Sequence, residues 1–174
     1  MVMTTTVMPV IAAGSYRIDP DASVIGFTTK HMFGLGTVKG TFGIRSGQVR
    51  IGADPLTSTA AVVIDVASFH TDKPKRDQDV TSKRFLDAAD HPTIEVRLTE
   101  VRSGPDGWAV AGDLIVKGTS TRIVLTLEEI EPTATGLRGV ATTVVDRHAA
   151  GITYGKGLAG RYLTMTVEIA AERL

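Results

Sequence analysis

From Tyr16 to Leu174, apolar and polar residues alternate with a period of two over long stretches. Successive side chains of a β-strand point to opposite faces, so this pattern is typical of strands with one buried face. Further strands are expected at residues 24–30, 37–45, 48–51 and 59–66. The clearest apolar stripes are Ile94, Val96 and Leu98; Trp108, Val110, Gly112, Leu114 and Val116; Ile123, Leu125 and Leu127; and Leu163, Met165, Val167, Ile169 and Ala171.

Short segments with turn-forming residues join the later strands. Residues 103–107, 117–120 and 133–136 each contain glycine, which adopts positive φ without steric cost. Strands joined by such short turns are antiparallel neighbours. About eight strands can close into a barrel, which leaves no exposed sheet edge. The sequence therefore predicts an all-β fold, an antiparallel β-barrel of about eight strands.

A polar segment at residues 72–90 interrupts the alternation and predicts a small helical insertion. Pro74 suits the first turn of a helix, which we expect over residues 75–82. Arg76 and Asp77 are expected to form an ion pair that holds this helix, and a polar anchor for a ligand is the alternative. The helix end would dock on the barrel through apolar residues: Phe85, Leu86 and Ala89.

Composition limits the function classes that the chain can serve. The 19 Lys and Arg balance 19 Asp and Glu, which argues against a dedicated nucleic-acid binder. The chain has no cysteine, so disulfides, thiol catalysis and thiolate metal sites are excluded. The four histidines are far apart in the sequence, and no nucleophile, phosphate-loop or dinucleotide motif is present. We therefore expect no metal site and favour a container over a catalyst.

Residues 1–15 are expected to form a flexible tail before a single domain at residues 16–174. No Lys or Arg precedes Arg17, and Pro9 interrupts the apolar stretch that a secretory signal would need. No apolar run approaches the roughly 20 residues of a transmembrane helix. We expect a cytoplasmic protein without a transmembrane segment.

Several motifs, in a fixed order, resemble the YceI-like family. They are YRIDPDASVIGFTTKHMFGLGTVKGTF at residues 16–42, IDVASFHT at 64–71, FLDAADHPTI at 85–94, VAGDLIVKGTSTRIVLTL at 110–127 and VDRHAAGI at 145–152. The resemblance implies an extended lipocalin-like barrel with a helical insertion. Its interior is expected to hold a polyisoprenoid, such as an isoprenoid quinone, or another amphiphilic lipid. The resemblance also implies a homodimer and no cofactor apart from this lipid.

The sequence departs from the family pattern at two places. The usual histidine before the serine is replaced, because the chain reads Asp21-Ala22-Ser23, which alters polarity at one end of the barrel. The RHAAGI element lacks the usual Asp-Phe pair, which reshapes a loop at the rim.

The expected ligand-binding residues lie on the inward faces of the strands and at the barrel mouth. His31 follows a strand end with Met32 and Phe33, where a histidine could bind a head-group oxygen. Packing of a filled core is the alternative role for the inward residues, and an interaction module would need such a filled barrel. An isomerase or hydrolase that uses His31 or Asp77 on a buried apolar substrate is a further alternative. The candidates are Phe27, His31, Met32, Phe33, Phe42, Ile64, Arg76, Asp77, Phe85, Ile94, Val96, Leu98, Leu114, Val116, Ile123, Leu125, Met165 and Val167.

Overall fold

Nine strands and one α-helix form the described part of the chain in this computed structural model, which covers residues 9–31, 35–155 and 159–174. Two short 3₁₀ turns, η1 and η2, lie at Pro20–Ala22 and Pro55–Thr57. The α-helix and strands are β1 (Gly14–Ile18), β2 (Val24–His31), β3 (Gly36–Ile51), β4 (Thr59–His70), α1 (Pro74–Thr81), β5 (Thr93–Gly104), β6 (Gly107–Val116), β7 (Thr119–Pro132), β8 (Gly136–Asp146) and β9 (Tyr162–Arg173).

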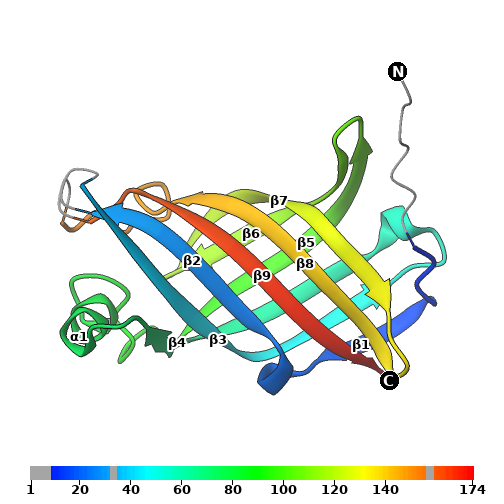
Figure 1. Ribbon diagram of the computed structural model, residues 1–174, viewed down its shortest axis with the longest axis horizontal. Helices are drawn as coiled ribbons and strands as arrows, with labels where there is room; N and C mark the ends of the chain where they lie inside the picture. Colours follow the sequence, from blue (N-terminus) through cyan, green and yellow to red (C-terminus); the bar gives the residue numbers. More distant parts are fainter. Residues whose placement is uncertain (1–8, 32–34, 156–158) are drawn as a thin grey trace.

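The strands close into the predicted antiparallel barrel. Strands β2 to β9 form a ring of eight in the order β3-β2-β9-β8-β7-β6-β5-β4, and β4 pairs with β3 to close it. The additional strand β1 continues the position of β2, since both pair with β3 and β9. Figure 1 shows these strands crossing the long axis at a slant, which a closed barrel requires.

Hydrogen bonds around Ser23 bridge the break between β1 and β2. The backbone N–H of Ala170 on β9 donates to Ser23 Oγ over 3.0 Å, and the N–H of Asp19 donates to Ala170 O over 2.8 Å. The serine of the DAS motif therefore completes the barrel wall at the interruption, where its side chain is buried.

One predicted boundary is wrong: residues 37–45 and 48–51 belong to a single strand, β3. A bulge between Ile44 and Ser46 inserts one extra residue, so the inward face passes from even to odd residue numbers. Phe42 and Ile44 are buried before the bulge and Val49 is buried after it. This change of parity explains why the alternation resembles two separate strands.

The hairpins form where the turn residues predict them. Lys117 and Gly118 both have positive φ, at 49° and 77°, as a type I′ turn between β6 and β7 requires. Helix α1 starts at Pro74, one residue before the predicted start, and its first turn also carries Asp77. After the helix, Leu86 is buried and Phe85 is half-buried, but Ala89 is exposed and Ala88 packs on the core in its place.

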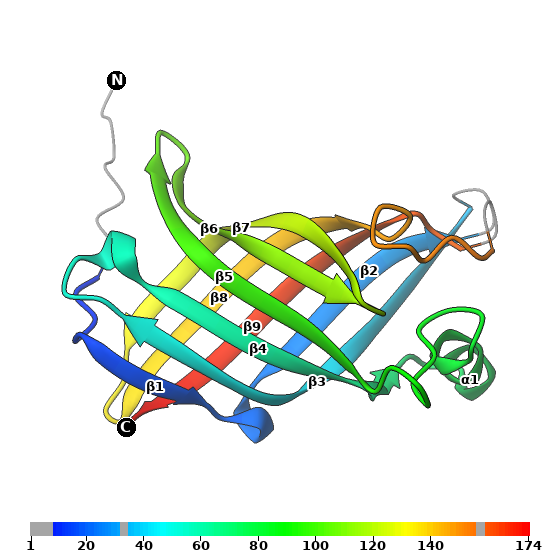
Figure 2. The ribbon, with the colours of Figure 1, turned by 180° about the vertical axis from the view of Figure 1, so that it is seen from behind.

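Helix α1 and the segment after β8 lie at one end of the elongated barrel, whereas β1 and the C-terminus lie at the other (Figures 1 and 2). The most deeply buried large side chains are Tyr16, Ile18, Val66 and Leu137. Among the described residues, no helix combines the length and the apolar character needed to cross a bilayer.

Candidate functional site: two apolar cavities inside the barrel

The barrel interior contains two cavities that follow one another along its axis. Neighbouring inward residues of the same strand line different cavities: Val62 and Ile64 on β4, and Val167 and Met165 on β9. We call them the β1-end cavity, which includes Val62 and Val167, and the α1-end cavity, which includes Ile64 and Met165. The barrel is therefore partly hollow over much of its length.

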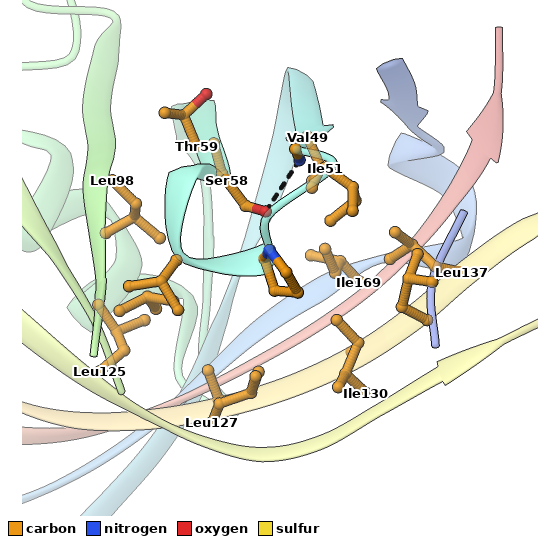
Figure 3. A pocket seen from close by; sticks show the side chains of 18 of the residues that line it. Val49, Ile51, Ser58, Thr59, Leu98, Leu125, Leu127, Ile130, Leu137 and Ile169 are labelled. Carbon is orange, nitrogen blue, oxygen red and sulfur yellow. Dashed lines mark hydrogen bonds between the residues drawn. The ribbon is translucent and has the colours of Figure 1, made fainter. Parts of the chain in front are cut away.

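The β1-end cavity has a volume of about 440 Å³ and a mainly apolar lining. Figure 3 shows side chains from β3, β5, β7, β8 and β9 that surround the same space. Near the wall, the N–H of Gly52 donates to Ser58 Oγ over 3.1 Å, which satisfies one of the few polar groups there. Residues 9–13, at the start of the described chain, also line this cavity.

The α1-end cavity has a volume of about 340 Å³ and contains a cluster of three aromatic rings. Phe27, Phe42 and Phe69 lie with their ring centroids 5.2–5.9 Å apart, in stacked, tilted and edge-on arrangements. Inward residues of β4, β5, β6 and β9 complete the wall, and Val80 of α1 contributes to the lining. The helical insertion therefore covers this end of the interior.

A buried cation, Arg147, lies at the rim of the α1-end cavity with only 8% of the residue exposed. Its Nε donates to Gly160 O over 2.7 Å, and its Nη2 donates to Ala159 O over 3.0 Å. Its Nη1 donates to both Ile152 O and Tyr154 O over 2.8 Å. Arg147 directly follows β8, and its guanidinium therefore holds residues 152–154 next to residues 159–160 within the segment between β8 and β9.

Burial lowers the pKa of the Arg147 guanidinium, and the nearby charge of Asp146 opposes this shift. Arginine stays protonated at neutral pH even after such a shift, so a positive charge persists here. The guanidinium carbon also lies 5.9 Å from the centre of the Phe85 ring. Lys117 Nζ donates to Phe85 O over 3.0 Å and joins the β6–β7 turn to the segment after α1.

The expected ion pair between Arg76 and Asp77 does not form. Arg76 Nη1 lies 3.4 Å from Asp72 Oδ1, one helical turn earlier, whereas Asp77 Oδ2 lies 3.6 Å from His70 Nδ1. Asp77 Oδ1 also accepts hydrogen bonds from the N–H and hydroxyl of Thr71, at 2.9 and 2.6 Å. Helical geometry separates the two side chains, since adjacent residues point about 100° apart. Arg76 lines the α1-end cavity, and Asp77 fastens the start of the helix to β4.

Residues 16–172 match the YceI-like domain. The chain belongs to the YceI-like family. It is 30% identical to a UPF0312 protein of Yersinia pestis (strain Pestoides F) over 116 residues, which cover 65% of this chain and 60% of that protein. It is 29% identical over 119 residues to a UPF0312 protein of Photorhabdus laumondii, with 67% and 62% covered. The chain thus matches less than two thirds of the length of these relatives.

Solved structures show the same YceI-like fold at low sequence identity. BcnA of Burkholderia cenocepacia superposes with a TM-score of 0.73 at 21% identity, and the match covers 87% of this chain and 98% of that chain. A polyisoprenoid-binding domain from Saccharophagus degradans, implicated in plant cell wall breakdown, gives a TM-score of 0.63 at 14% identity, with 94% and 100% covered.

The structure places most candidate residues of this YceI-like barrel around the cavities. His31 ends β2, opposite Gly36, and its side chain is outside the described structure; Met32 and Phe33 also lie outside the described residues. Val96 and Ile123 pack on the core cluster but line neither cavity. The α1-end cavity is lined by Phe27, Phe42, Ile64, Arg76, Phe85, Ile94, Leu114, Val116 and Met165, and the β1-end cavity by Leu98, Leu125 and Val167.

Sequence reasoning missed two kinds of lining residue. Phe69 lies three residues after Val66, so uninterrupted alternation would turn it outward, but an irregularity in the β3–β4 pairing turns it inward. Ile11, in the expected tail, packs on the core and lines the β1-end cavity. The aromatic character of Phe69 was the available signal, whereas nothing in the tail distinguishes Ile11.

In the described part of the chain, no three His, Asp or Glu side chains gather closely enough to hold a metal ion. The lining of both cavities is mainly apolar, and the charged residues that line the α1-end cavity are Arg76, Asp79 and Arg147.

Proposed function

We propose that this protein binds a long polyisoprenoid or a similar amphiphilic lipid inside the barrel, and sequesters or carries it without catalysis. The observation that carries the proposal is the pair of apolar cavities placed end to end along the barrel axis. Their volumes, about 440 and 340 Å³, each lie within the usual range for small-molecule sites. An elongated apolar ligand matches this arrangement better than a compact one.

The hydrophobic effect supplies the affinity in this proposal. Each five-carbon unit removed from water contributes on the order of 3 kcal/mol, from roughly 0.8 kcal/mol per CH₂ with a discount for imperfect contact. Four such units sum to about 12 kcal/mol, which corresponds to nanomolar affinity before ordering costs are subtracted. The chain therefore dominates binding, and the head group mainly sets the orientation.

The polar end of the ligand is proposed to lie at the α1 end. Arg76 lines that cavity, and among the described residues its ion-pair partner is the exposed Asp72, at 3.4 Å. Its remaining N–H groups are suited to an oxygen-bearing head group, such as a carbonyl or a phosphate. The β1-end cavity, with its mainly apolar lining, would receive the end of the chain.

The comparisons support a binding role, because one structural neighbour in the family is described as a polyisoprenoid-binding domain. The engaged carboxylate of Asp77 supports the absence of catalysis, since Thr71 and His70 already hold it as part of the helix attachment. A general base must reach the proton that it removes, and Asp77 lines neither cavity.

Mass spectrometry of the purified protein tests the proposal directly. Native spectra and organic extracts should reveal a prenyl or other long-chain lipid that co-purifies at a defined ratio. Leu114→Asp places a carboxylate on the buried wall of the α1-end cavity and should remove this lipid or unfold the barrel. Ser120→Asp adds the same charge at an exposed neighbouring position and should leave the lipid bound.

Two results would contradict the proposal. One is a folded Leu114→Asp variant that retains its lipid. The other is a wild-type protein that binds no added prenol after its lipids have been extracted and it has refolded.

A further inference from the structure

Strands β7 and β8 separate near the α1 end of the barrel. Their backbone pairing extends from Pro132–Leu137 to Thr126–Thr142 and stops there, although both strands continue. Beyond this point β7 pairs only with β6, and β8 pairs only with β9. In Figure 2 the yellow-green tip of the β6–β7 hairpin diverges from β8. We call the opening between residues 121–125 and 143–146 the slit.

Residues from both faces of the sheet line a groove of about 570 Å³ at the slit. Val124 and Val144 point outward, with 44% and 60% of each residue exposed, whereas Ile123 and Val145 pack on the core. Because side chains from both faces of the sheet line this groove, it lies between β7 and β8. Val145 also lines the α1-end cavity, so the groove and the interior meet at this side chain.

A single side-chain hydrogen bond between β7 and β8 is recorded across the slit. The hydroxyl of Thr143 donates to Val124 O over 2.8 Å, in place of the paired backbone bonds found further along the two strands. Widening the slit therefore breaks this bond and no backbone pair of the β7–β8 ladder, and a displaced β6–β7 turn would also lose the bond from Lys117 Nζ to Phe85 O.

The two ends of the barrel are held more firmly. At the α1 end, moving residues 152–154 and 159–160 away from Arg147, which directly follows β8, would break the four hydrogen bonds of its guanidinium. These bonds are charge-assisted and therefore stronger than a bond from a neutral hydroxyl. At the β1 end, hydrogen bonds from Tyr16 and Arg173 hold residues 12 and 13 against the barrel. Opening the slit therefore breaks fewer hydrogen bonds than opening the α1 end does.

We propose that the slit is the lateral binding site through which a prenyl or acyl chain enters and leaves the barrel. This inference rests on the proposed function, because it assumes a lipid inside. Val124 and Val144 offer the chain apolar contact on the outside, and Val145 leads it to the α1-end cavity. Thr143 acts as a latch that closes behind the chain.

A reversible cross-link tests this route, and the cysteine-free chain makes it selective. Val124→Cys and Val144→Cys lie opposite each other when the recorded register is extended by two residues. A short bis-methanethiosulfonate reagent would join them across the slit. The matched control is Glu131→Cys with Arg138→Cys, an exposed pair on the same two strands at the other end.

The readout is the exchange rate of fluorescent anthraniloyl-labelled geranylgeraniol from delipidated and reloaded protein. The cross-linked slit should slow exchange by about tenfold or more, and reduction of the reagent should restore the original rate. The control pair should exchange at the wild-type rate with and without the reagent. Unchanged exchange in the cross-linked slit would overturn the inference and leave the proposed function intact, whereas no binding by the wild type would overturn both.

Substitution of Thr143 tests the same route independently, through the rate of lipid exchange and without a cross-link. Thr143→Val removes the hydroxyl at nearly constant volume and should accelerate exchange severalfold. Thr142→Val is the control, because the neighbouring Thr142 hydroxyl donates instead to Glu128 Oε1 over 2.8 Å. Equal exchange rates in these two variants would contradict the role of Thr143.

Discussion

Arg147 shows how one side chain can organise a loop that has no regular structure. Its guanidinium satisfies four backbone carbonyls, and carbonyl groups buried without partners are costly. An arginine suits this position because its planar fork presents several donors at fixed angles. The segment between β8 and β9 is therefore organised around one cation at the rim of the α1-end cavity.

Arg147→Leu should destabilise the protein by roughly 3 kcal/mol, because it leaves these carbonyls without donors. For a chain of this length, that change corresponds to a decrease in melting temperature of about 6–12 °C. Arg147→Lys should have an intermediate effect, since an ammonium group keeps the charge but cannot reproduce the fork. Thermal unfolding monitored by circular dichroism checks both variants. Equal melting temperatures for wild type and Arg147→Leu would contradict the organising role.

At the scale of the strands, an ion pair holds the end of β8 next to the start of β9. Arg161 donates to both carboxylate oxygens of Asp146, through Nε over 3.0 Å and Nη2 over 2.9 Å. The N–H groups of His148 and Ala149 also donate to Asp146 Oδ1. Hydrogen bonding from Arg161 lowers the pKa of Asp146 from 3.8 to about 2. The carboxylate thereby joins the end of one strand to the start of the next.

This lowered pKa predicts an acid-dependent contribution to stability. A depressed pKa in the folded state stabilises the protein above the unfolded pKa of 3.8, and the contribution is lost as pH falls toward 2. Asp146→Asn should therefore lower the free energy of unfolding at neutral pH, and the difference from wild type should shrink below about pH 4. Urea titrations between neutral and acid pH measure this difference.

Asp106→Asn provides the control, because Asp106 lies exposed in the β5–β6 turn, away from the connection between β8 and β9. Its free energy of unfolding should stay close to the wild-type value at neutral pH. A difference for Asp146→Asn that is independent of pH would show that the clamp does not depend on the carboxylate charge.

At the scale of the whole molecule, two cavities in series predict selection by chain length. Ala141→Phe would fill part of the β1-end cavity, which Ala141 lines. The variant should lose affinity for solanesol more strongly than for farnesol, because the shorter chain fits within the α1-end cavity. Displacement of a fluorescent prenol by each alcohol measures the two affinities. Equal losses for both alcohols would contradict an end-to-end arrangement of the ligand.

At the scale of the whole molecule, we also expect the protein to form a dimer. The formal net charge is zero, so long-range repulsion between copies is small, and the resemblance to the family favours a two-fold dimer. Sedimentation velocity at tens of micromolar should therefore show a dimer. A single 18.4 kDa species under these conditions would contradict this prediction.

The sequence by itself determined the class of fold. Alternation with a period of two reports a strand with one buried face whatever its partner is, and the turns at residues 103–107 and 117–120 depend on local backbone preferences. Pro74 marked the helix start within one residue for the same local reason. The inward orientation of residues such as Leu114 and Met165 could be predicted from the alternation, because their strands run without interruption through this part of the barrel.

Only the tertiary structure decided at which residues the inward and outward faces of a strand exchange, and which parts of the barrel are closed. A bulge reverses the inward and outward faces beyond it, and its position depends on the partner strand. Val49 and Phe69 therefore point inward for reasons that their own segments do not encode. The four carbonyls around Arg147 come from residues 152 to 160, and the slit arises where β7 and β8 stop pairing. Such features depend on contacts between segments distant in the chain, which local periodicity cannot report.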